Sequence, residues 1–373
     1  MGVVFFTAVV AEASIPGEAK IYVAGHNGLV GSAIMRRLNA KGYTNIVARS
    51  SAELDLTNQE AVENFFKEVR PEYVFLAAAK VGGIEANSKY PAEFCYKNLM
   101  IGTNVVHMSH KYGVKKLLNL GSSCIYPRNA PQPIKETALL TAELESTNEA
   151  YAVAKIATLS MCKYHNQQYG TNFISLMPTG LYGENDNFNM ETAHLLPMLM
   201  RRFHLAKLLQ NGDFDGIRKD LQKHPIGYGV DSEDIISKSP AELEAILNKL
   251  GARKGKVIVW GDGTAYRELM NSDDLADVCV YFMENAECDH NNISEWVNVT
   301  SGQDITLKEL LEIIKGVVEF TGNIEYDPTK PNGTPRKLMD DGRLQAIIHG
   351  WKPKVSLKDG IKNLYDWYKV TAS

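Results

Sequence analysis

Three glycines separated by two residues each, Gly25, Gly28 and Gly31, constrain the fold of this chain most strongly. They follow a short β-branched run at 20–24 and precede a helical pattern at 32–41. A strand, a glycine turn and a helix in this order are typical of the first βα unit of a dinucleotide-binding sheet. In such a unit the first glycine permits the tight turn, the second lets the backbone approach a pyrophosphate, and the third lets the helix pack closely on the strand.

The same spacing places a helix N-terminus where phosphate oxygens would lie. Free N–H groups and the positive end of the helix dipole favour an anion at that position. We therefore expect the loop to bind the pyrophosphate of a dinucleotide through Gly25, Asn27, Gly28, Leu29, Val30 and Gly31.

Short apolar runs and helical patterns alternate over the first part of the chain. The predicted strands lie at 20–24, 45–49, 72–78 and 116–121, and the predicted helices at 32–41, 60–69 and 91–112. Such alternation indicates βαβ units and a parallel sheet covered by helices on both faces. We predict an α/β fold, a Rossmann-type doubly wound parallel sheet with a smaller α/β substrate-binding lobe.

The alternation breaks down near residue 179, which divides the chain into parts. We expect residues 1–19 to be a disordered or appended extension rather than a secretory signal, because no positive residue precedes their apolar stretch. The expected dinucleotide-binding domain comprises 20–178 and about 264–300, and the expected substrate-binding lobe comprises about 179–263 and 301–373. Within the lobe, the polar segment at about 208–254 looks like an insertion and contains one predicted helix, which begins at the capping box Ser239–Glu242.

Composition and charge exclude several classes of protein. The 373 residues include 40 basic and 44 acidic side chains, a net charge of -4, whereas nucleic-acid binders usually carry a basic excess. No apolar run reaches the roughly 18 residues that span a bilayer. The five cysteines form no Cys-x-x-Cys pair, which argues against a disulfide framework and a zinc cluster. We expect a cytoplasmic protein with no metal and with neither nucleic acid nor membrane as a partner.

The residue at the end of the second predicted strand distinguishes the two nicotinamide dinucleotides. An NAD enzyme has an acid there to accept bonds from the ribose 2′-hydroxyl, but this chain has Arg49. A guanidinium pairs well with a phosphate, which favours NADP(H). The alternative is that Arg49 is a solvated charge at the end of a strand. Asp55 follows shortly after and is a candidate for the adenine pocket.

A tyrosine and a lysine four residues apart on a helix share one face and together form a proton donor for a carbonyl group. This spacing occurs four times, beginning at Tyr112, Tyr151, Tyr326 and Tyr365. Only the pair that begins at Tyr151 starts a helix shortly after a strand that ends in serines. We therefore expect Tyr151 to donate the proton, and Lys155 to lower the phenol pKa and bind the nicotinamide ribose.

Several longer motifs are more specific than this pair. They are Ala77–Ile84 (Ala-Ala-Ala-Lys-Val-Gly-Gly-Ile), Gly121–Pro127 (Gly-Ser-Ser-Cys-Ile-Tyr-Pro), Tyr151-x-x-x-Lys155, Asn187-Phe188, His194–Pro197 (His-Leu-Leu-Pro) and Trp260-Gly261-x-Gly263. Together they resemble the GDP-L-fucose synthases, the GDP-4-keto-6-deoxymannose 3,5-epimerase-4-reductases of the extended short-chain dehydrogenase family. The resemblance covers about residues 20–207 and 256–370.

The resemblance implies two reactions at one sugar, GDP-4-keto-6-deoxy-D-mannose, which end in GDP-L-fucose. The 4-keto group acidifies the protons at C3 and C5, and each inversion needs a base on one face and an acid on the other. By resemblance these roles belong to Cys124 and His194, while Ser122 and Tyr151 stabilise the enolate oxygen. NADPH then delivers hydride to C4 as Tyr151 donates the proton.

Further contacts are implied by the resemblance alone. For the cofactor they are Ala78, Leu120, Lys155, Pro178, Leu181 and His194. For GDP they are Arg202, Trp260, Arg267 and Lys337, that is, cations for the diphosphate and an aromatic ring for stacking. On a regular helix His194 would face Arg201 better than Arg202, which argues against the choice of Arg202. A homodimer is also implied.

Three positions depart from the pattern of the family. Gly180 stands where asparagine is usual, so we expect a side-chain hydrogen bond between cofactor and substrate to be missing. Glu184 and Asn185 stand where proline and histidine are usual.

Other interpretations compete with this one. Cys124 is alternatively a core residue, and Arg201 with Arg202 a solvated basic face. A nucleotide-sugar epimerase or dehydratase that uses NAD as a returned oxidant is a second function, and a non-catalytic NADP-binding module is a third. Arg49 and the pair of Cys124 and His194 argue against the second, and the presence of Tyr151 argues against the third.

Overall fold

The computed structural model describes residues 15–372 apart from 231–233, 236, 289–295 and 331–332. Its largest sheet has six strands in the order β10-β5-β4-β3-β1-β2, and every neighbouring pair is parallel. These strands are β1 (Ile21–Ala24), β2 (Ile46–Val47), β3 (Tyr73–Leu76), β4 (Lys116–Leu120), β5 (Phe173–Pro178) and β10 (Trp296–Val299). Strand β1 lies between β2 and β3, so the strand order reverses there, which confirms the predicted doubly wound sheet.

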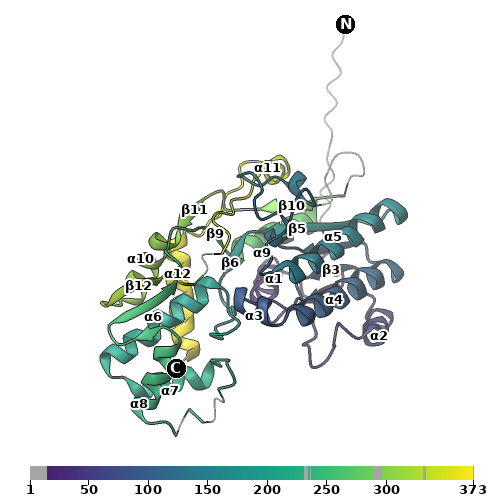
Figure 1. Cartoon of the computed structure of the whole chain (residues 1–373). Coiled ribbons are helices and arrows are strands. Elements are labelled where there is room, and N and C mark those ends of the chain that lie inside the picture. Colours follow the sequence, from purple (N-terminus) through teal and green to yellow (C-terminus); the bar gives the residue numbers. More distant parts are fainter. Residues whose placement is uncertain (1–14, 231–233, 236, 289–295, 331–332, 373) are drawn as a thin grey trace.

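Helices cover both faces of this sheet because its strands are apolar on both sides. In β1, Ile21 and Val23 pack into one core cluster and Tyr22 and Ala24 into another. The first cluster lies under α1 (Leu29–Ala40) and α9 (Ser272–Asn285), and the second lies under α2 (Gln59–Val69), α4 (Pro91–Lys111) and α5 (Glu149–Tyr169) (Figure 1). Shorter helices are α3 (Ile84–Lys89), η1 (Ser123–Ile125), η2 (Glu136–Ala138) and α11 (Gly342–Ile347).

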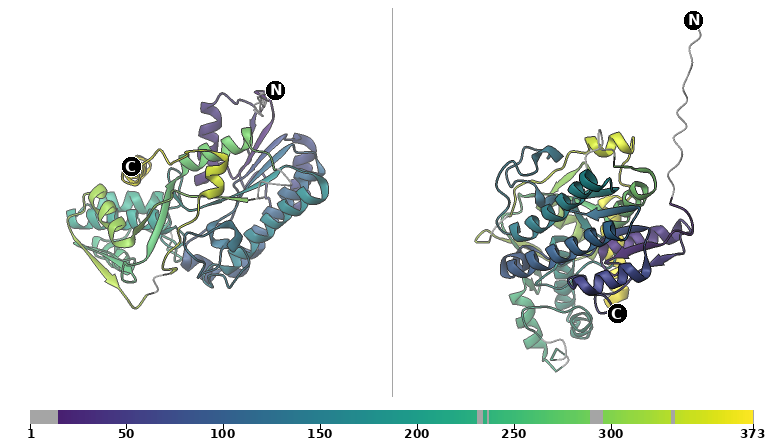
Figure 2. Two further views of the ribbon diagram at one scale, coloured as in Figure 1. Left: turned by 90° about the horizontal axis from the view of Figure 1, so that it is seen from above. Right: turned by 90° about the vertical axis from the view of Figure 1, so that its right-hand side faces the viewer.

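The second lobe lies to one side of the six-stranded sheet, as the view from above shows (Figure 2). Its sheet has the order β12-β8-β7, built from β12 (Asn323–Asp327), β8 (Lys256–Trp260) and β7 (Ala252–Arg253). Its helices are α6 (Leu195–Asn211), α7 (Phe214–Lys223), α8 (Pro240–Lys249), α10 (Leu307–Val318) and α12 (Leu357–Ala372). Apolar side chains from all five helices and from β7 and β8 form one core.

A third sheet joins the two parts. It has the order β11-β9-β6, from β11 (Asp304–Thr306), β9 (Tyr266–Asn271) and β6 (Gly180–Tyr182). Glu268 of β9 is buried and accepts hydrogen bonds from the main-chain N–H groups of Ser301, Gly302 and Met339, at 2.6, 3.1 and 3.1 Å. One carboxylate thus ties this sheet to the segments that follow β10 and precede α11.

The structure differs from the expected elements in three places. Strand β2 is only two residues long. Segment 208–254 holds a second helix, α7, whose N-cap Asp213 accepts from Gly216 N, and Ile217 and Leu221 of that helix are fully buried. Residues 1–14 of the expected extension lie outside the described residues, whereas Ile15 and Ala19 pack into the core. None of the helices in the described part of the chain is long and apolar enough to span a membrane.

Candidate active site

The glycine loop is built by close backbone contacts that leave no room for side chains. Gly25 has φ +85°, and a Cβ there would lie 2.7 Å from the Cα of Ala78. A Cβ at Gly31 would lie 2.0 Å from the carbonyl oxygen of Gly25. Gly28 N–H donates to the same carbonyl at 3.1 Å. Gly25 and Gly31 therefore hold the turn between β1 and α1 in a form that only glycine accommodates, whereas a Cβ at Gly28 would make an ordinary contact, 3.5 Å from the Gly25 carbonyl oxygen.

Helix α1 begins with unshielded N–H groups. Gly28 is the N-cap and has no side chain to accept a bond from the first turn, and that turn contains no acidic residue. Leu29 and Val30 are the first helical residues. An anion at this end is stabilised by the free N–H groups and the helix dipole, so the residues present fit a dinucleotide pyrophosphate.

Arg49 and Asp55 lie on the exposed side of the β1–β2 edge. The Arg49 guanidinium donates to its neighbouring Ala48 carbonyl at 2.8 Å and lies 6.0 Å from the Phe65 ring centre. One oxygen of Asp55 accepts from both the N–H and the hydroxyl of Thr57, at 2.9 and 2.7 Å, and these bonds lower its pKa. Their roles toward phosphate and adenine stay predictions.

The segment after β4 and the first two turns of α5 carry four of the expected catalytic side chains. Lys155 of α5 is buried and donates to the carbonyl of Leu120 at 2.7 Å, and burial lowers its pKa to about 8. Its Nζ lies 5.8 Å from the ring centre of Tyr151. Burial is the largest influence on Tyr151 and raises its pKa, whereas a hydrogen bond from Ser122 acts in the opposite direction. The phenol therefore stays protonated at neutral pH, as a proton donor must.

Ser122 and Cys124 are held by the short helix η1. Cys124 N–H donates to Ser122 Oγ at 3.2 Å. The Cys124 thiol accepts from the side-chain amide of Asn148 at 3.3 Å, and the sulfur is close enough to Tyr151 to raise the phenol pKa electrostatically. Hydroxyl, thiol and phenol are thus brought together, and Cys124 is partly exposed rather than core-buried. The other four cysteines are also free.

His194 lies at the start of α6 and not inside it. It is the N-cap residue, and its side chain makes no cap hydrogen bond. The ring is solvent-exposed, yet nearby protein atoms desolvate it enough to lower its pKa. Its neighbour Ala193 packs against Gly83 in the loop after β3, since a Cβ at Gly83 would lie 2.6 Å from the Ala193 carbonyl. In the described part of the chain, the His194 side chain makes no hydrogen bond to Ser122, Cys124 or Tyr151.

The adjacent arginines of α6 have different surroundings, and neither is on a solvated face. Arg201 is fully buried and paired with Asp220 of α7 at 2.9 Å, and it also donates to three main-chain carbonyls. Arg202 donates to the carbonyl of Ile258 at 2.7 Å, and its Nε is buried with no partner in the described structure. Burial lowers the Arg202 pKa to about 10. Because His194 precedes the helix, the helical-face argument against Arg202 does not apply.

The remaining candidate GDP contacts lie on β8, β9 and the loop before α11. Trp260 ends β8 and is 40% exposed, and the Lys330 ammonium lies 5.4 Å from the centre of its ring. Arg267 donates to the carbonyl of Thr334 at 2.8 Å, and burial lowers its pKa. Lys337 is partly exposed in that loop. These three residues and Arg202 belong to the lobe side of the molecule, but the described contacts do not join them directly.

The end of β5 continues into the third sheet through Pro178 and Leu181. Gly180 of β6 pairs with Leu269 of β9, and a Cβ at Gly180 would lie 2.8 Å from the carbonyl oxygen of Glu268. In this chain a side chain at position 180 would therefore require β9 to shift, and the expected loss of a side-chain hydrogen bond at Gly180 stays a prediction.

Two contacts at the site were missed by sequence reasoning. Tyr228, in segment 208–254, donates its hydroxyl to Glu85 of α3 at 2.7 Å, and both groups act electrostatically on Arg202. Asn148, which bonds Cys124, reads in the sequence only as an ordinary residue before a helix. The sequence gives no signal for the first contact, because its three residues are far apart along the chain.

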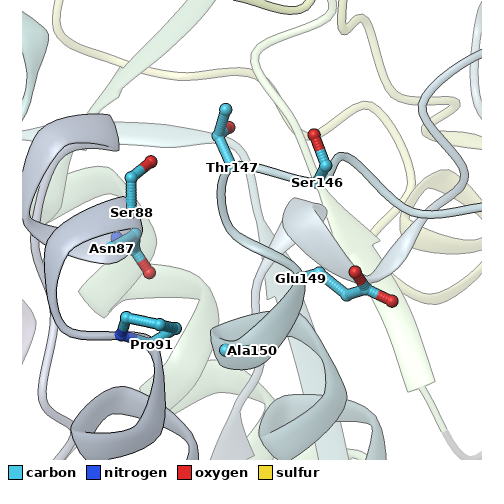
Figure 3. A pocket seen from close by; sticks show the side chains of 7 residues that line it. All are labelled: Asn87, Ser88, Pro91, Ser146, Thr147, Glu149 and Ala150. Atoms are coloured by element: carbon cyan, nitrogen blue, oxygen red, sulfur yellow. The ribbon is translucent and has the colours of Figure 1, made fainter.

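A pocket of about 370 Å³ lies beside this cluster rather than within it (Figure 3). Its lining comes from α3, the start of α4 and the turn into α5: Asn87, Ser88, Pro91, Ser146, Thr147, Glu149 and Ala150. None of the expected catalytic side chains lines it. It borders the turn that carries Asn148.

The pattern that defines the "NAD dependent epimerase/dehydratase family" matches residues 21–219 and 224–296. The chain belongs to this family. It is 51% identical over 351 residues to GDP-L-fucose synthase 1 of Arabidopsis thaliana, covering 94% of this chain and 93% of that protein. A solved GDP-6-OMe-4-keto-L-xylo-heptose reductase from Campylobacter jejuni superposes with a TM-score of 0.87 at 40% identity, covering 96% and 99%. A GDP-D-glycero-L-gluco-heptose synthase from the same organism, solved in the presence of NADPH, gives 0.84 at 40% identity, covering 95% and 99%.

Proposed function

We propose that this chain converts GDP-4-keto-6-deoxy-D-mannose to GDP-L-fucose by 3,5-epimerisation followed by NADPH-dependent reduction of the 4-keto group. One observation carries the proposal: at the sheet edge that holds the glycine loop, the Cys124 main chain bonds the Ser122 hydroxyl and the Cys124 sulfur lies near the Tyr151 phenol. A reductase alone needs the phenol and not the thiol. The identity to proteins named GDP-L-fucose synthase supports the substrate.

The 4-keto oxygen is the point at which the two reactions meet. Ser122 and Tyr151 donate to it, and thereby stabilise the negative charge that develops when a proton leaves C3 or C5. Cys124 and His194 move those protons, one acting on each face of the sugar. The lowered pKa of His194 favours a neutral imidazole, which is able to accept a proton.

The reduction uses the same oxygen-binding pair. NADPH, when bound along the glycine loop, supplies hydride to C4. Tyr151 then gives its proton to the 4-oxygen, and Lys155 holds the ribose side of the site and stabilises the phenolate that remains. Because Tyr151 is the donor, the raised phenol pKa keeps the proton available until charge develops on the sugar oxygen.

The lobe is proposed to hold GDP. Arg202, Arg267 and Lys337 offer cations for the diphosphate, and Trp260 offers an exposed ring for the base. The unpartnered Nε of Arg202 supports this assignment, because a buried donor without a partner is unfavourable until an acceptor arrives.

A homodimer in the cytoplasm completes the proposal. The exposed aromatic side chains Tyr96 of α4 and Tyr164 and Tyr169 of α5 support a subunit contact through these helices. The five free cysteines support a reducing compartment.

A second substrate is favoured by the structural comparison. Both superposed Campylobacter jejuni proteins are named for GDP-heptoses, so a GDP-4-keto-heptose is the competing substrate. Incubation of the chain with NADPH and either keto sugar, followed by NMR of the product, tests both. Production of GDP-L-fucose supports the proposal, and turnover of the heptose alone contradicts it.

Two variants separate the proposed steps. Cys124→Ser is expected to block exchange of the C3 and C5 protons with solvent deuterium, because the hydroxyl is a much weaker acid than the thiol. Tyr151→Phe is expected to abolish hydride transfer while NADPH affinity stays nearly unchanged. Normal exchange in Cys124→Ser, followed by NMR, would remove the thiol from the mechanism.

A further inference from the structure

Asn148 begins helix α5 without capping it. It is the N-cap residue, with φ −134° and ψ 17°, and its side chain makes no cap hydrogen bond. Asparagine at this position usually accepts from an N–H group of the first turn, which is worth about 1 kcal/mol. Asn58 and Asn271 do so at the starts of α2 and α9, where they accept from Ala61 N and Asp273 N. The amide of Asn148 is therefore used for something else.

The amide of Asn148 is directed at the thiol. Its Nδ2 donates to Cys124 Sγ at 3.3 Å. Its Oδ1 is buried and has no hydrogen-bond partner among the described residues. The helix thus loses a cap, and an acceptor is left unsatisfied. Both are unfavourable for folding, and such unfavourable arrangements persist mainly where they serve a function.

The bond fixes the thiol relative to the phenol. Asn148 and Tyr151 lie three residues apart in the first turn of α5, and the Cys124 main chain is held separately by Ser122 Oγ at 3.2 Å. Sγ is therefore tied to the same helical turn that carries the proton donor. A shift of that turn would move both reacting groups together.

We infer that Asn148 is a positioning residue for epimerisation: its amide N–H orients the Cys124 sulfur and stabilises it when it carries negative charge. The inference rests on the proposed function of Cys124. When the thiol acts as acid, the S–H bond breaks, the enolate electron pair forms the new C–H bond, and the 4-oxygen regains its carbonyl. When it acts as base, the thiolate takes the proton and the C–H electrons form the enolate. In either direction the sulfur is a thiolate at one end of the step, and an N–H donor favours that state.

The test uses Asn148→Asp, which keeps the side-chain shape but replaces the amide donor with a negatively charged acceptor. Aspartate caps helices as well as asparagine does, so the stability of α5 is expected to be maintained. A carboxylate cannot donate to sulfur and repels a thiolate. We expect C3 and C5 deuterium exchange to fall about ten- to a hundredfold, the range for a lost hydrogen bond to a charged atom. We also expect NADPH affinity to stay within about twofold of the parent.

Asn58→Asp is the matched control, because it makes the same change at a true cap in α2. Exchange and NADPH affinity should both be parental in this control. Asn148→Ser, which caps but is too short to reach the sulfur, should behave like Asn148→Asp. Parental exchange in folded Asn148→Asp would overturn the inference. So would a loss of exchange that is accompanied by equal losses of NADPH binding and melting temperature, since that pattern indicates a merely structural role.

A second measurement separates this inference from the proposed function. If the parent shows no C3 or C5 exchange, the proposed function fails, and alkylation of Cys124 by iodoacetamide tests the hydrogen bond on its own. The alkylated peptide is quantified by mass spectrometry at pH 8. Alkylation about ten times slower in Asn148→Asp than in the parent supports the inference, because the thiolate is the reacting form. Equal rates would overturn it.

Discussion

Lys155 is a buried cation with no acidic partner among the described residues. Its ammonium donates to the Leu120 carbonyl at 2.7 Å, and that bond does not offset the loss of water, since its pKa falls to about 8. Asp186 shows the corresponding effect for an acid, because burial raises its pKa to about 7. Both side chains are thus kept in energetically unfavourable surroundings, as is common where a ligand later supplies the missing interactions.

The folded protein without ligand should therefore become more stable when Lys155 is replaced by methionine. The unfolded chain binds the lysine proton with its ordinary pKa of 10.5, so between about pH 8 and 10.5 the unfolded state holds more protons and parental stability rises with pH. At pH 7 Lys155→Met should have a higher melting temperature than the parent. Its free energy of unfolding should be higher by at most about 3 kcal/mol. The difference should shrink as the pH approaches 10.

Thermal unfolding at pH 7 and pH 9.5 measures this effect. Lys67→Met is the control, because Lys67 is an exposed lysine of α2 and should show no such pH dependence. A lower melting temperature for Lys155→Met at pH 7 would mean that the bond to Leu120 outweighs the desolvation.

The elements around the site are joined by close approaches between main chains. Strand β6 is three residues long, and its pairing with β9 brings Gly180 next to the Glu268 carbonyl. Helix α5 serves two purposes, since its first turn carries Tyr151 and Asn148 while the rest packs against α4 and the sheet. In α5, therefore, the first turn positions site residues, while the remaining turns pack against the rest of the domain.

Gly180→Ala is expected to destabilise the protein by about 1–3 kcal/mol, the usual effect of forcing extra atoms into packed structure. The added Cβ would lie 2.8 Å from a main-chain oxygen, and main chain in a paired strand is not free to move away. Gly316→Ala in α10 is the opposite control, because nothing lies within 4 Å and alanine favours a helix by about 1 kcal/mol. Urea unfolding of the two variants measures their free energies of unfolding. An unchanged stability of Gly180→Ala would show that the main chain of β9 moves to make room for the added Cβ.

At the scale of the whole molecule, the lobe core includes the segment that looked like an insertion. Asp220 of α7 pairs with Arg201 of α6 and also accepts from Tyr368 of α12, so one buried acid joins three helices. Glu268 has a similar function between the third sheet and the segments around β10 and α11. Segment 208–254 is therefore part of the folded core of the lobe rather than an appendage to it.

The two adjacent arginines should consequently respond differently to replacement. Arg201→Met leaves Asp220 buried without its partner and should cost about 3–5 kcal/mol of stability. Arg202→Met removes a cation that has no acidic ion-pair partner in the described structure, so stability should change little while GDP affinity falls. Thermal unfolding measures the stability of each variant, and calorimetric titration with GDP measures its GDP affinity. Parental GDP affinity in Arg202→Met would exclude this residue from the nucleotide site.

Most of the local structure follows from the sequence because it depends on neighbouring residues. The apolar periods placed the main strands and helices, the capping box located the start of α8, and the glycine spacing located the turn after β1. Helix α7 was missed because its pattern is short and polar, and only its packing on Arg201 shows which face is buried.

The sequence alone also determined which residue types are present, and the motifs indicated their chemistry. Four tyrosine–lysine pairs were reduced to one by their local context, with no knowledge of distances. Only the tertiary structure decided which of Arg201 and Arg202 pairs with a buried acid, how closely β9 approaches Gly180, and where the Asn148 amide points. The physical reason is the same in each case: these properties depend on atoms that are distant along the chain and become neighbours only when the chain folds.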